Sequence, residues 1–201
     1  EPFKGLFTQG MVCHETYKDE DNNWVSPDEV FTENGKDFFK IKDKKKIIFG
    51  ASESMSKSKK NTIDPEKIID QYGADAVRFF ILSDSPPEKD VQWSDQGMIA
   101  AYKFVQKFWI LHKKIIEQIK KKERKSKSVD LAIYANKLVE KYTLSLEKFN
   151  MNVLIAYLHE TYNFLNKEID NLDIKNLEEN YLKILILMFP VLPHLVSECL
   201  K

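Results

Sequence analysis

Residues 55–95 read MSKSKKNTIDPEKIIDQYGADAVRFFILSDSPPEKDVQWSD, and they carry the clearest structural signals of the chain. The Asp-Pro-Glu at 64–66 predicts a helix start, because aspartate is a good N-cap, proline suits the first helical position and glutamate favours the positive end of the helix dipole. Gly73 predicts the end of this helix in a left-handed conformation. A second helix, over 74–82, ends at the breaker sequence 83–87. The stretch therefore predicts a polar loop followed by two short helices.

The residues before this stretch, 3–50, are irregular and rich in β-forming side chains. Glu33-Asn34-Gly35-Lys36 is a hairpin-type turn signal. Strands are predicted over 38–41 and 47–50, on either side of the charged turn at 42–46. We interpret this region as a small β insertion.

From residue 96 onward the pattern changes to long amphipathic helices with short connections, which predicts an antiparallel helical bundle. The predicted fold class is therefore α+β and mainly α, with a domain at 1–95 followed by a helical domain at 96–201. The four apolar stripes are Met98, Tyr102, Val105, Trp109, His112, Ile115 and Ile119; Leu131, Ala135, Leu138, Tyr142 and Leu146; Met151, Leu154, Leu158, Thr161, Leu165 and Ile169; and Leu177, Tyr181, Ile184, Leu185 and Met188.

The composition excludes several classes of protein. The 201 residues carry 31 basic and 31 acidic side chains, so any case for nucleic-acid binding must rest on local charge. Cys13 and Cys199 have neither disulfide nor metal-ligand spacing, which fits a reducing cytosol and predicts no metal site. No apolar run approaches the roughly 18–20 residues that span a membrane. Because both ends interrupt a pattern, we expect the chain to be part of a longer protein.

The segment Met55-Ser56-Lys57-Ser58 is the first candidate site. Hydroxyl and ammonium groups beside a helix N-terminus are suited to a polyphosphate, so one interpretation is a mobile phosphate-binding loop. The glycines of a Walker A loop are absent. The alternative is a solvated charged turn without a ligand.

The flanking sequence bears on this choice. MSKSK with its DP helix start, YGADAVR and SPPEKDVQW resembles, in the same order, the second signature region of class I aminoacyl-tRNA synthetases. The opening EPFKGLFTQGMVCHETYK and the closing LMFPVLPHLVSECL also resemble these enzymes, and the leucyl-tRNA synthetase family most of all. The resemblance spans nearly the whole chain. It implies a partial Rossmann-type catalytic remnant followed by the anticodon-binding bundle.

By this resemblance, Lys57 is the catalytic residue that stabilises the departing pyrophosphate when leucine is activated by ATP. Ser54, Met55, Ser56 and Ser58 complete the ATP-binding loop. Ser54 stands where the family has a first lysine, so we expect weaker ATP binding unless Lys59 or Lys60 substitutes.

The resemblance also implies the partners of the complete enzyme: leucine tRNA, leucine, and ATP with magnesium, with no ligand bound tightly to this chain alone. It implies a cytoplasmic monomer without a membrane partner. The other class I signature, a His-x-x-His sequence, is absent from this chain. We therefore expect the N-terminal catalytic half, the editing insertion and the last C-terminal domain to lie outside it, and the chain alone to be inactive.

Several basic residues are candidates for contact with tRNA phosphates. For Arg78 the alternative is an ion pair with Asp75 or Asp84. For the cluster at 120–127 the alternative is a solvated helix end. The candidates are Lys59, Lys60, Arg78, Lys113, Lys114, Lys120, Lys121 and Arg124.

Two further choices stay open at this point. Trp93, Trp109 and Tyr102 are base-stacking candidates, but the stripe pattern favours a core position for Trp109 and Tyr102. For the whole chain, the alternatives are a fragment of a valyl, isoleucyl or methionyl enzyme, and a non-enzymatic helical module that binds RNA or protein. The second alternative predicts a solvated turn at 54–58. The synthetase reading predicts that residues 1–12 and 48–61 pack together in an incomplete sheet with an exposed edge.

Overall fold

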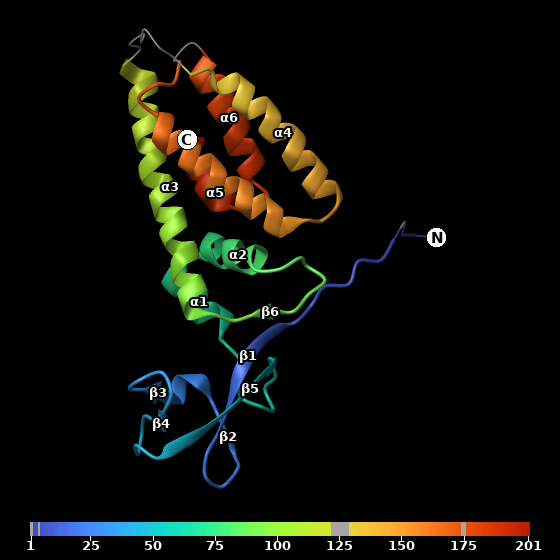
Figure 1. Ribbon diagram of the computed structural model, residues 1–201, viewed down its shortest axis with the longest axis vertical. Coiled ribbons are helices and arrows are strands. Elements are labelled where there is room, and N and C mark those ends of the chain that lie inside the picture. Colours follow the sequence, from blue (N-terminus) through green and yellow to red (C-terminus); the bar gives the residue numbers. More distant parts are fainter. Residues whose placement is uncertain (1, 4, 122–128, 174–175) are drawn as a thin grey trace. The chain divides into compact units, whose positions relative to one another are not determined.

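The computed structural model describes residues 2–3, 5–121, 129–173 and 176–201 (Figure 1). The chain forms two compact units, residues 1–69 with 88–94, and residues 70–87 with 95–201. The first unit is built on a sheet and the second is helical, so the predicted α+β, mainly α class is confirmed. The segment 70–87 groups with the bundle, whereas the sequence places it before the boundary at 95. The division into functional domains at 95 stays a prediction.

The first unit contains a six-stranded sheet in the order β2-β1-β5-β4-β3, with β6 pairing β1. All pairs are antiparallel except β1 with β6. The predicted hairpin turn at 33–36 joins β3 to β4, which confirms it. The strands are β1 (Val12–Lys18), β2 (Trp24–Val25), β3 (Val30–Thr32), β4 (Phe38–Lys40), β5 (Lys46–Ser54) and β6 (Val91–Gln92), with a 3-10 turn at Pro27–Glu29.

The longest pairing, β1 with β5, contains an irregularity that bends the sheet. The register shifts between Glu15 and Tyr17, opposite Gly50. A Cβ on Gly50 would lie 2.4 Å from the hydroxyl oxygen of Thr16, so this close approach requires glycine. Tyr17, Val25 and Ile47 form the small core beside it.

The expected packing of residues 1–12 against 48–61 is only partly found. Strand β1 begins at Val12, and the described residues before it form no strand. Residues 12–18, rather than 1–12, supply the partner of β5. Gly10 lies too close to the Lys89 carbonyl to accept a side chain, which fits a bend at this point. The Rossmann-type origin of the sheet stays a prediction.

The second unit is a helical bundle with short turns (Figure 1). Its core is formed by the inward stripes of the long helices, with Phe108, Tyr142, Leu158 and Ile184 wholly buried. Helix α1 runs from the first unit into the second. The helices are α1 (Pro65–Tyr72), α2 (Ala74–Ser83), α3 (Asp95–Lys121), α4 (Leu131–Glu147), α5 (Met151–Glu168), α6 (Leu177–Met188) and α7 (Pro193–Cys199).

The helix ends follow the predicted local chemistry with one difference. Asp64 Oδ1 accepts the backbone N–H of Glu66 at 3.0 Å, which confirms the helix start. Gly73 has a φ of +81°, as a glycine cap requires. Its ψ of 151° is not that of a left-handed helical cap. This extended conformation is essentially restricted to glycine and turns the chain directly from α1 into α2.

The apolar stripe predicted for the first long helix is displaced by part of a turn. The buried face of α3 consists of Met98, Ala101, Phe104, Phe108, Leu111, His112 and Ile115. Tyr102, Val105 and Trp109 are only half-buried and lie at its edge. The core assignment of Tyr102 and Trp109 was therefore wrong, whereas the stripes of α4, α5 and α6 are largely as predicted.

Candidate functional site

The loop at 54–60 is a tight turn attached to the end of β5. The backbone N–H of Met55 donates to the carbonyl of Val12 at 3.0 Å, which holds the loop to β1. The hydroxyls of Ser56 and Ser58 lie 3.0 Å apart. The backbone N–H of Lys59 donates to the Ser56 hydroxyl oxygen at 3.3 Å. The two serines therefore shape the turn and leave the lysines on its outside.

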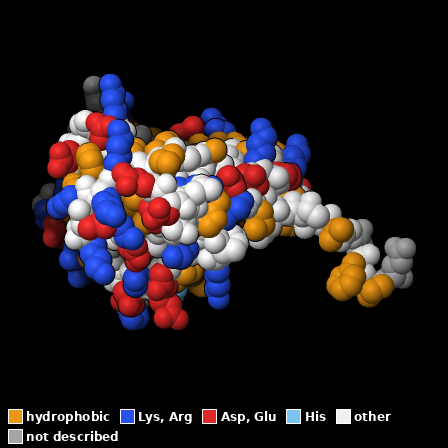
Figure 2. Space-filling view, turned by 90° about the horizontal axis from the view of Figure 1, so that it is seen from below, with side chains coloured by type: hydrophobic (Ala, Val, Ile, Leu, Met, Phe, Trp, Pro, Cys, Tyr) orange, Lys and Arg blue, Asp and Glu red, His pale blue; other side chains and the backbone are white. Residues whose placement is uncertain are grey.

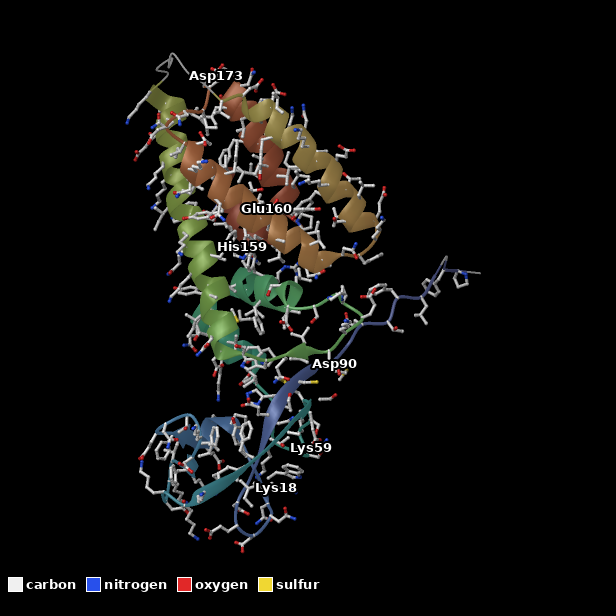
Figure 3. The ribbon with its side chains drawn as sticks, viewed as in Figure 1. Lys18, Lys59, Asp90, His159, Glu160 and Asp173 are labelled. Atoms are coloured by element: carbon white, nitrogen blue, oxygen red, sulfur yellow. The ribbon has the colours of Figure 1, made fainter. Side chains whose placement is uncertain are left out.

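The lysines of this loop have different surroundings. The Lys57 side chain is exposed and forms no ion pair within the described part of the chain. Lys59, which is labelled in Figure 3, instead forms an ion pair with Glu53 on β5. Lys60 is exposed and has a φ of +55°, which is strained for a residue with a Cβ. Lys57 and Lys60 are thus the two loop cations that have no acidic partner among the described residues.

Asn61 ends the loop and is one of the least accessible polar residues in the chain, at 0% exposure. Its Oδ1 accepts the backbone N–H of Ser56 at 2.9 Å. Its amide nitrogen donates to the carbonyl oxygens of Glu53 at 3.0 Å and His14 at 3.3 Å. The sequence analysis missed this residue, because an asparagine after a run of lysines is indistinguishable from an ordinary solvated turn residue.

Arg78 does not form the ion pair considered for it, and its contact with tRNA stays a prediction. Its guanidinium donates to the carbonyl of Pro190 at 2.7 Å and to that of Val191 at 3.3 Å, where α6 ends. Neither Asp75 nor Asp84 is its ion-pair partner among the described contacts. Arg78 therefore satisfies carbonyls at the turn between α6 and α7.

Asp75 performs the complementary task at the start of α7. Its buried carboxylate accepts the backbone N–H groups of Leu195 at 2.6 Å and His194 at 3.3 Å, and the His194 ring Nδ1 lies 2.9 Å away. A carboxylate at a helix N-terminus satisfies free donors and favours the helix dipole. Asp75 and Arg78, three residues apart on α2, thus hold both ends of the α6–α7 turn.

A cavity of about 570 Å³ lies in the second unit between the start of α2, α3 and α7. Trp109 and Leu195 are among its apolar lining residues, and Gln106, His194 and Glu198 are among its polar ones. The His194 side chain is 74% exposed. The Trp109 ring stacks on His112 with 5.4 Å between centroids.

The lysines predicted to contact tRNA on the long helix lie along the exposed side of α3. Lys113, Lys114, Lys120 and Lys121 are all exposed. The Lys113 ammonium lies 5.2 Å from the centroid of the Trp109 ring, a cation–π distance. Arg124 lies outside the described residues. Trp93 belongs to the first unit, where its backbone N–H donates to the Cys13 carbonyl at 2.8 Å.

The face of the molecule seen in Figure 2 carries charges of both signs. Figure 2 shows basic and acidic side chains interleaved on the visible face, as the zero net charge suggests. Within the described ranges, no group of three His, Cys, Asp or Glu side chains could hold a metal ion. Among the described helices, none combines the length and apolarity needed to cross a membrane.

Comparison with known proteins adds independent information. The sequence model of class I tRNA synthetases (I, L, M and V) matches residues 47–94, which include the loop. The chain is 41% identical to leucine–tRNA ligase of Rickettsia bellii over 200 residues. It is 42% identical to that of Bartonella quintana over 212 residues. These alignments cover 98% and 99% of the chain but 24% of each relative.

A solved structure with a similar fold is the LeuRS agnB2 of Agrobacterium radiobacter K84, determined as a ternary complex with tRNA and LeuAMS. The TM-score is 0.63 at 23% identity, and the match covers 73% of this chain and 20% of that one. At this identity the likeness supports the fold alone.

Proposed function

We propose that this chain is part of a leucine–tRNA ligase, because it is about 40% identical to such enzymes, of whose length it spans about a quarter. The complete protein activates leucine with ATP and transfers it to leucine tRNA. This segment supplies the loop that meets the pyrophosphate and part of the surface that holds the tRNA. The observation that carries the proposal is the match of about 40% identity over 98% of the chain, with the loop inside it.

In the proposed activation step, a carboxylate oxygen of leucine attacks the α-phosphorus of ATP. The bond from that phosphorus to the bridging oxygen breaks, and pyrophosphate leaves with the electron pair. Negative charge grows on the departing oxygens, so a cation that reaches them in the transition state accelerates the step. We assign this role to Lys57, because it is the lysine of the Met-Ser-Lys-Ser sequence within the matched region, and its exposed ammonium has no acidic partner in the described part of the chain.

The other loop residues have supporting roles in this proposal. Ser54, Met55, Ser56 and Ser58 form the ATP-binding turn, and the mutual contact of the two central hydroxyls fixes its shape. Lys59 forms an ion pair with Glu53, so it would contact a phosphate only after that ion pair breaks. We place magnesium on the phosphate oxygens of ATP, which are its preferred ligands.

In the second step, a ribose hydroxyl at the tRNA 3′ end attacks the leucyl carbonyl, and AMP leaves. For this chain we propose that α3 contacts the tRNA backbone through Lys113, Lys114, Lys120 and Lys121, and that Arg124 extends the same surface. We do not include Arg78 among these proposed tRNA contacts, because its guanidinium donates to carbonyls of the α6–α7 turn. We propose a cytoplasmic, monomeric protein.

The experiment that tests the tRNA role is a salt titration of binding to leucine tRNA and to a mixture of other tRNAs. Each phosphate contact should add about 0.9 to the slope of log affinity against log salt. A variant with Lys113 and Lys114 changed to alanine should bind tRNA more weakly. The slope of its log affinity against log salt should be smaller by the amount expected for two phosphate contacts. A double change of Lys36 and Lys42, in the sheet unit, is the matched control.

The outcomes distinguish recognition of leucine tRNA from binding through charge alone. Preference for leucine tRNA would support a recognition role for this segment. Equal and steeply salt-dependent binding to all tRNAs would mean that the lysines act only through charge, and specificity would then lie elsewhere in the protein. Binding that is independent of salt would contradict the proposed contacts.

A further inference from the structure

The loop that carries Lys57 depends on one buried side chain for its attachment to the sheet. Asn61 has 0% exposure although it directly follows four residues with exposed or half-exposed side chains. Burying a primary amide is costly unless its donors and acceptor all find partners. Such a residue at the end of a surface loop therefore needs a specific explanation.

Every polar atom of this amide is used. Oδ1 accepts from the Ser56 backbone N–H at 2.9 Å. Nδ2 lies 3.0 Å from the carbonyl oxygen of Glu53, 3.3 Å from that of His14 and 3.4 Å from that of Ser54. The amide thus joins three segments: strand β1, the end of strand β5 and the first half of the loop.

Only a primary amide of this length can make this set of contacts. An aspartate has the same shape and could still accept from Ser56, but it has no donors for the three carbonyls and would place a charge against them. An alanine would leave the Ser56 N–H and these carbonyls without this partner. The site therefore discriminates between side chains of nearly equal size.

We propose that Asn61 is a positioning residue, which sets the place of Lys57 by fixing both ends of its loop to the sheet. This inference rests on the function proposed above for Lys57. The loop enters from β5 at Ser54 and leaves at Asn61, so one side chain ties entry, exit and the turn between them. The ion pair between Lys59 and Glu53 gives a second, more exposed tie on the same side.

The first test measures the tie itself, in the 201-residue chain. Amide hydrogen exchange at Ser56, followed by NMR, should be at least about tenfold faster in Asn61→Ala, since the loss of one net hydrogen bond is worth about a factor of ten. Asn61→Asp keeps an acceptor for this amide, so Ser56 should stay more protected than in the alanine variant. Unchanged exchange in Asn61→Ala would overturn the structural basis of the proposal.

The second test measures the consequence, in a full-length ligase that carries this segment. Both Asn61→Ala and Asn61→Asp should lower kcat for leucine-dependent ATP–pyrophosphate exchange about 10- to 100-fold, as expected for a displaced catalytic group. KM for ATP should change by less than about threefold, because Lys57 acts mainly in the transition state. A thermal melt of each variant beside the wild type shows whether a loss of kcat comes from a loss of folding.

The matched control is Asn180→Ala in the helical unit. Asn180 is also buried, at 2% exposure, and its amide nitrogen donates to the Asn176 carbonyl at 2.8 Å. This variant should lose thermal stability without the selective loss in kcat. Parallel losses of stability and kcat in the Asn61 and Asn180 variants would overturn the positioning role. If the wild-type ligase showed no leucine-dependent exchange, the proposed function would fail first, and the role of Asn61 with it.

Discussion

The carboxylate of Asp75 on α2 accepts the backbone N–H of Leu195 on α7 at 2.6 Å, across 120 positions of sequence. This contact joins two motifs that are far apart in the chain, YGAD and PHL. It acts as a helix cap supplied from another helix, because the helix it serves has no side-chain cap of its own.

We predict that Asp75→Ala lowers the free energy of unfolding of the helical unit by about 1–3 kcal/mol, the usual cost of leaving buried donors without a partner. Asp84→Ala, at an exposed position close by, should change it by less than about 0.5 kcal/mol. Denaturant unfolding followed by far-UV circular dichroism measures both. Equal effects of the two substitutions would show that Asp75 is not a cap.

Tyr142 and Tyr181 allow a second comparison of two matched substitutions. Both rings are buried, and burial raises the pKa of both phenols. The Tyr181 hydroxyl lies 2.9 Å from His112 Nδ1, whereas that of Tyr142 has no hydrogen-bond partner among the described residues. Tyr142→Phe should leave the free energy of unfolding unchanged or raise it, and Tyr181→Phe should lower it by about 1–2 kcal/mol. The reverse order in a thermal melt would contradict these assignments.

His112 predicts a pH dependence of stability. Burial lowers the pKa of this histidine below its ordinary value of 6.5. The unfolded chain then binds a proton at a pH where the folded chain does not, so stability falls as the pH drops below about 6.5 and down through the folded pKa. His112→Gln should flatten the slope between pH 7 and 5 by up to about 1.4 kcal/mol per pH unit. His159, whose pKa is lowered by burial and by Lys107, contributes to the slope that remains.

A substitution at Ser54 tests the effect of having serine where the resembling enzymes have the first lysine of the loop. Ser54 is exposed at the end of β5, and its hydroxyl lies 3.9 Å from the sulfur of Cys13 on β1. Ser54→Lys should therefore be accommodated and should lower KM for ATP in the full-length ligase, because it adds a cation at the edge of the loop. Unchanged KM and kcat would mean that Lys59 or Lys60 already supplies this charge. Ser52→Lys on the same strand is the control.

Local chemistry explains which parts of the fold could be predicted from the sequence. The helix start at Asp64, the positive φ of Gly73 and the hairpin turn around Gly35 each depend on a few neighbouring residues, and all three are found. The inward stripes of α4 to α6 are also largely found, because their apolar residues recur at helical spacing over several turns.

The incorrect or missed predictions concern residues whose contacts come from distant segments of the chain. On α3 both Phe104-Phe108-Leu111 and Tyr102-Val105-Trp109 have helical spacing, and packing against the neighbouring helices buries the first set. The partners of Arg78 and Asp75 lie more than 100 residues away, so their capping role could not be read from spacing. Asn61 is buried only because strands β1 and β5 bring carbonyls around it.

The central claim is that Lys57 stabilises the departing pyrophosphate in leucine activation. Its most direct test is leucine-dependent ATP–pyrophosphate exchange by the full-length ligase with Lys57→Ala, compared with Lys60→Ala in the same loop. We predict a loss of at least about 100-fold in kcat for Lys57→Ala, the typical cost of removing one group that stabilises transition-state charge, and a much smaller loss for Lys60→Ala. Equal rates for wild type and Lys57→Ala would contradict the account.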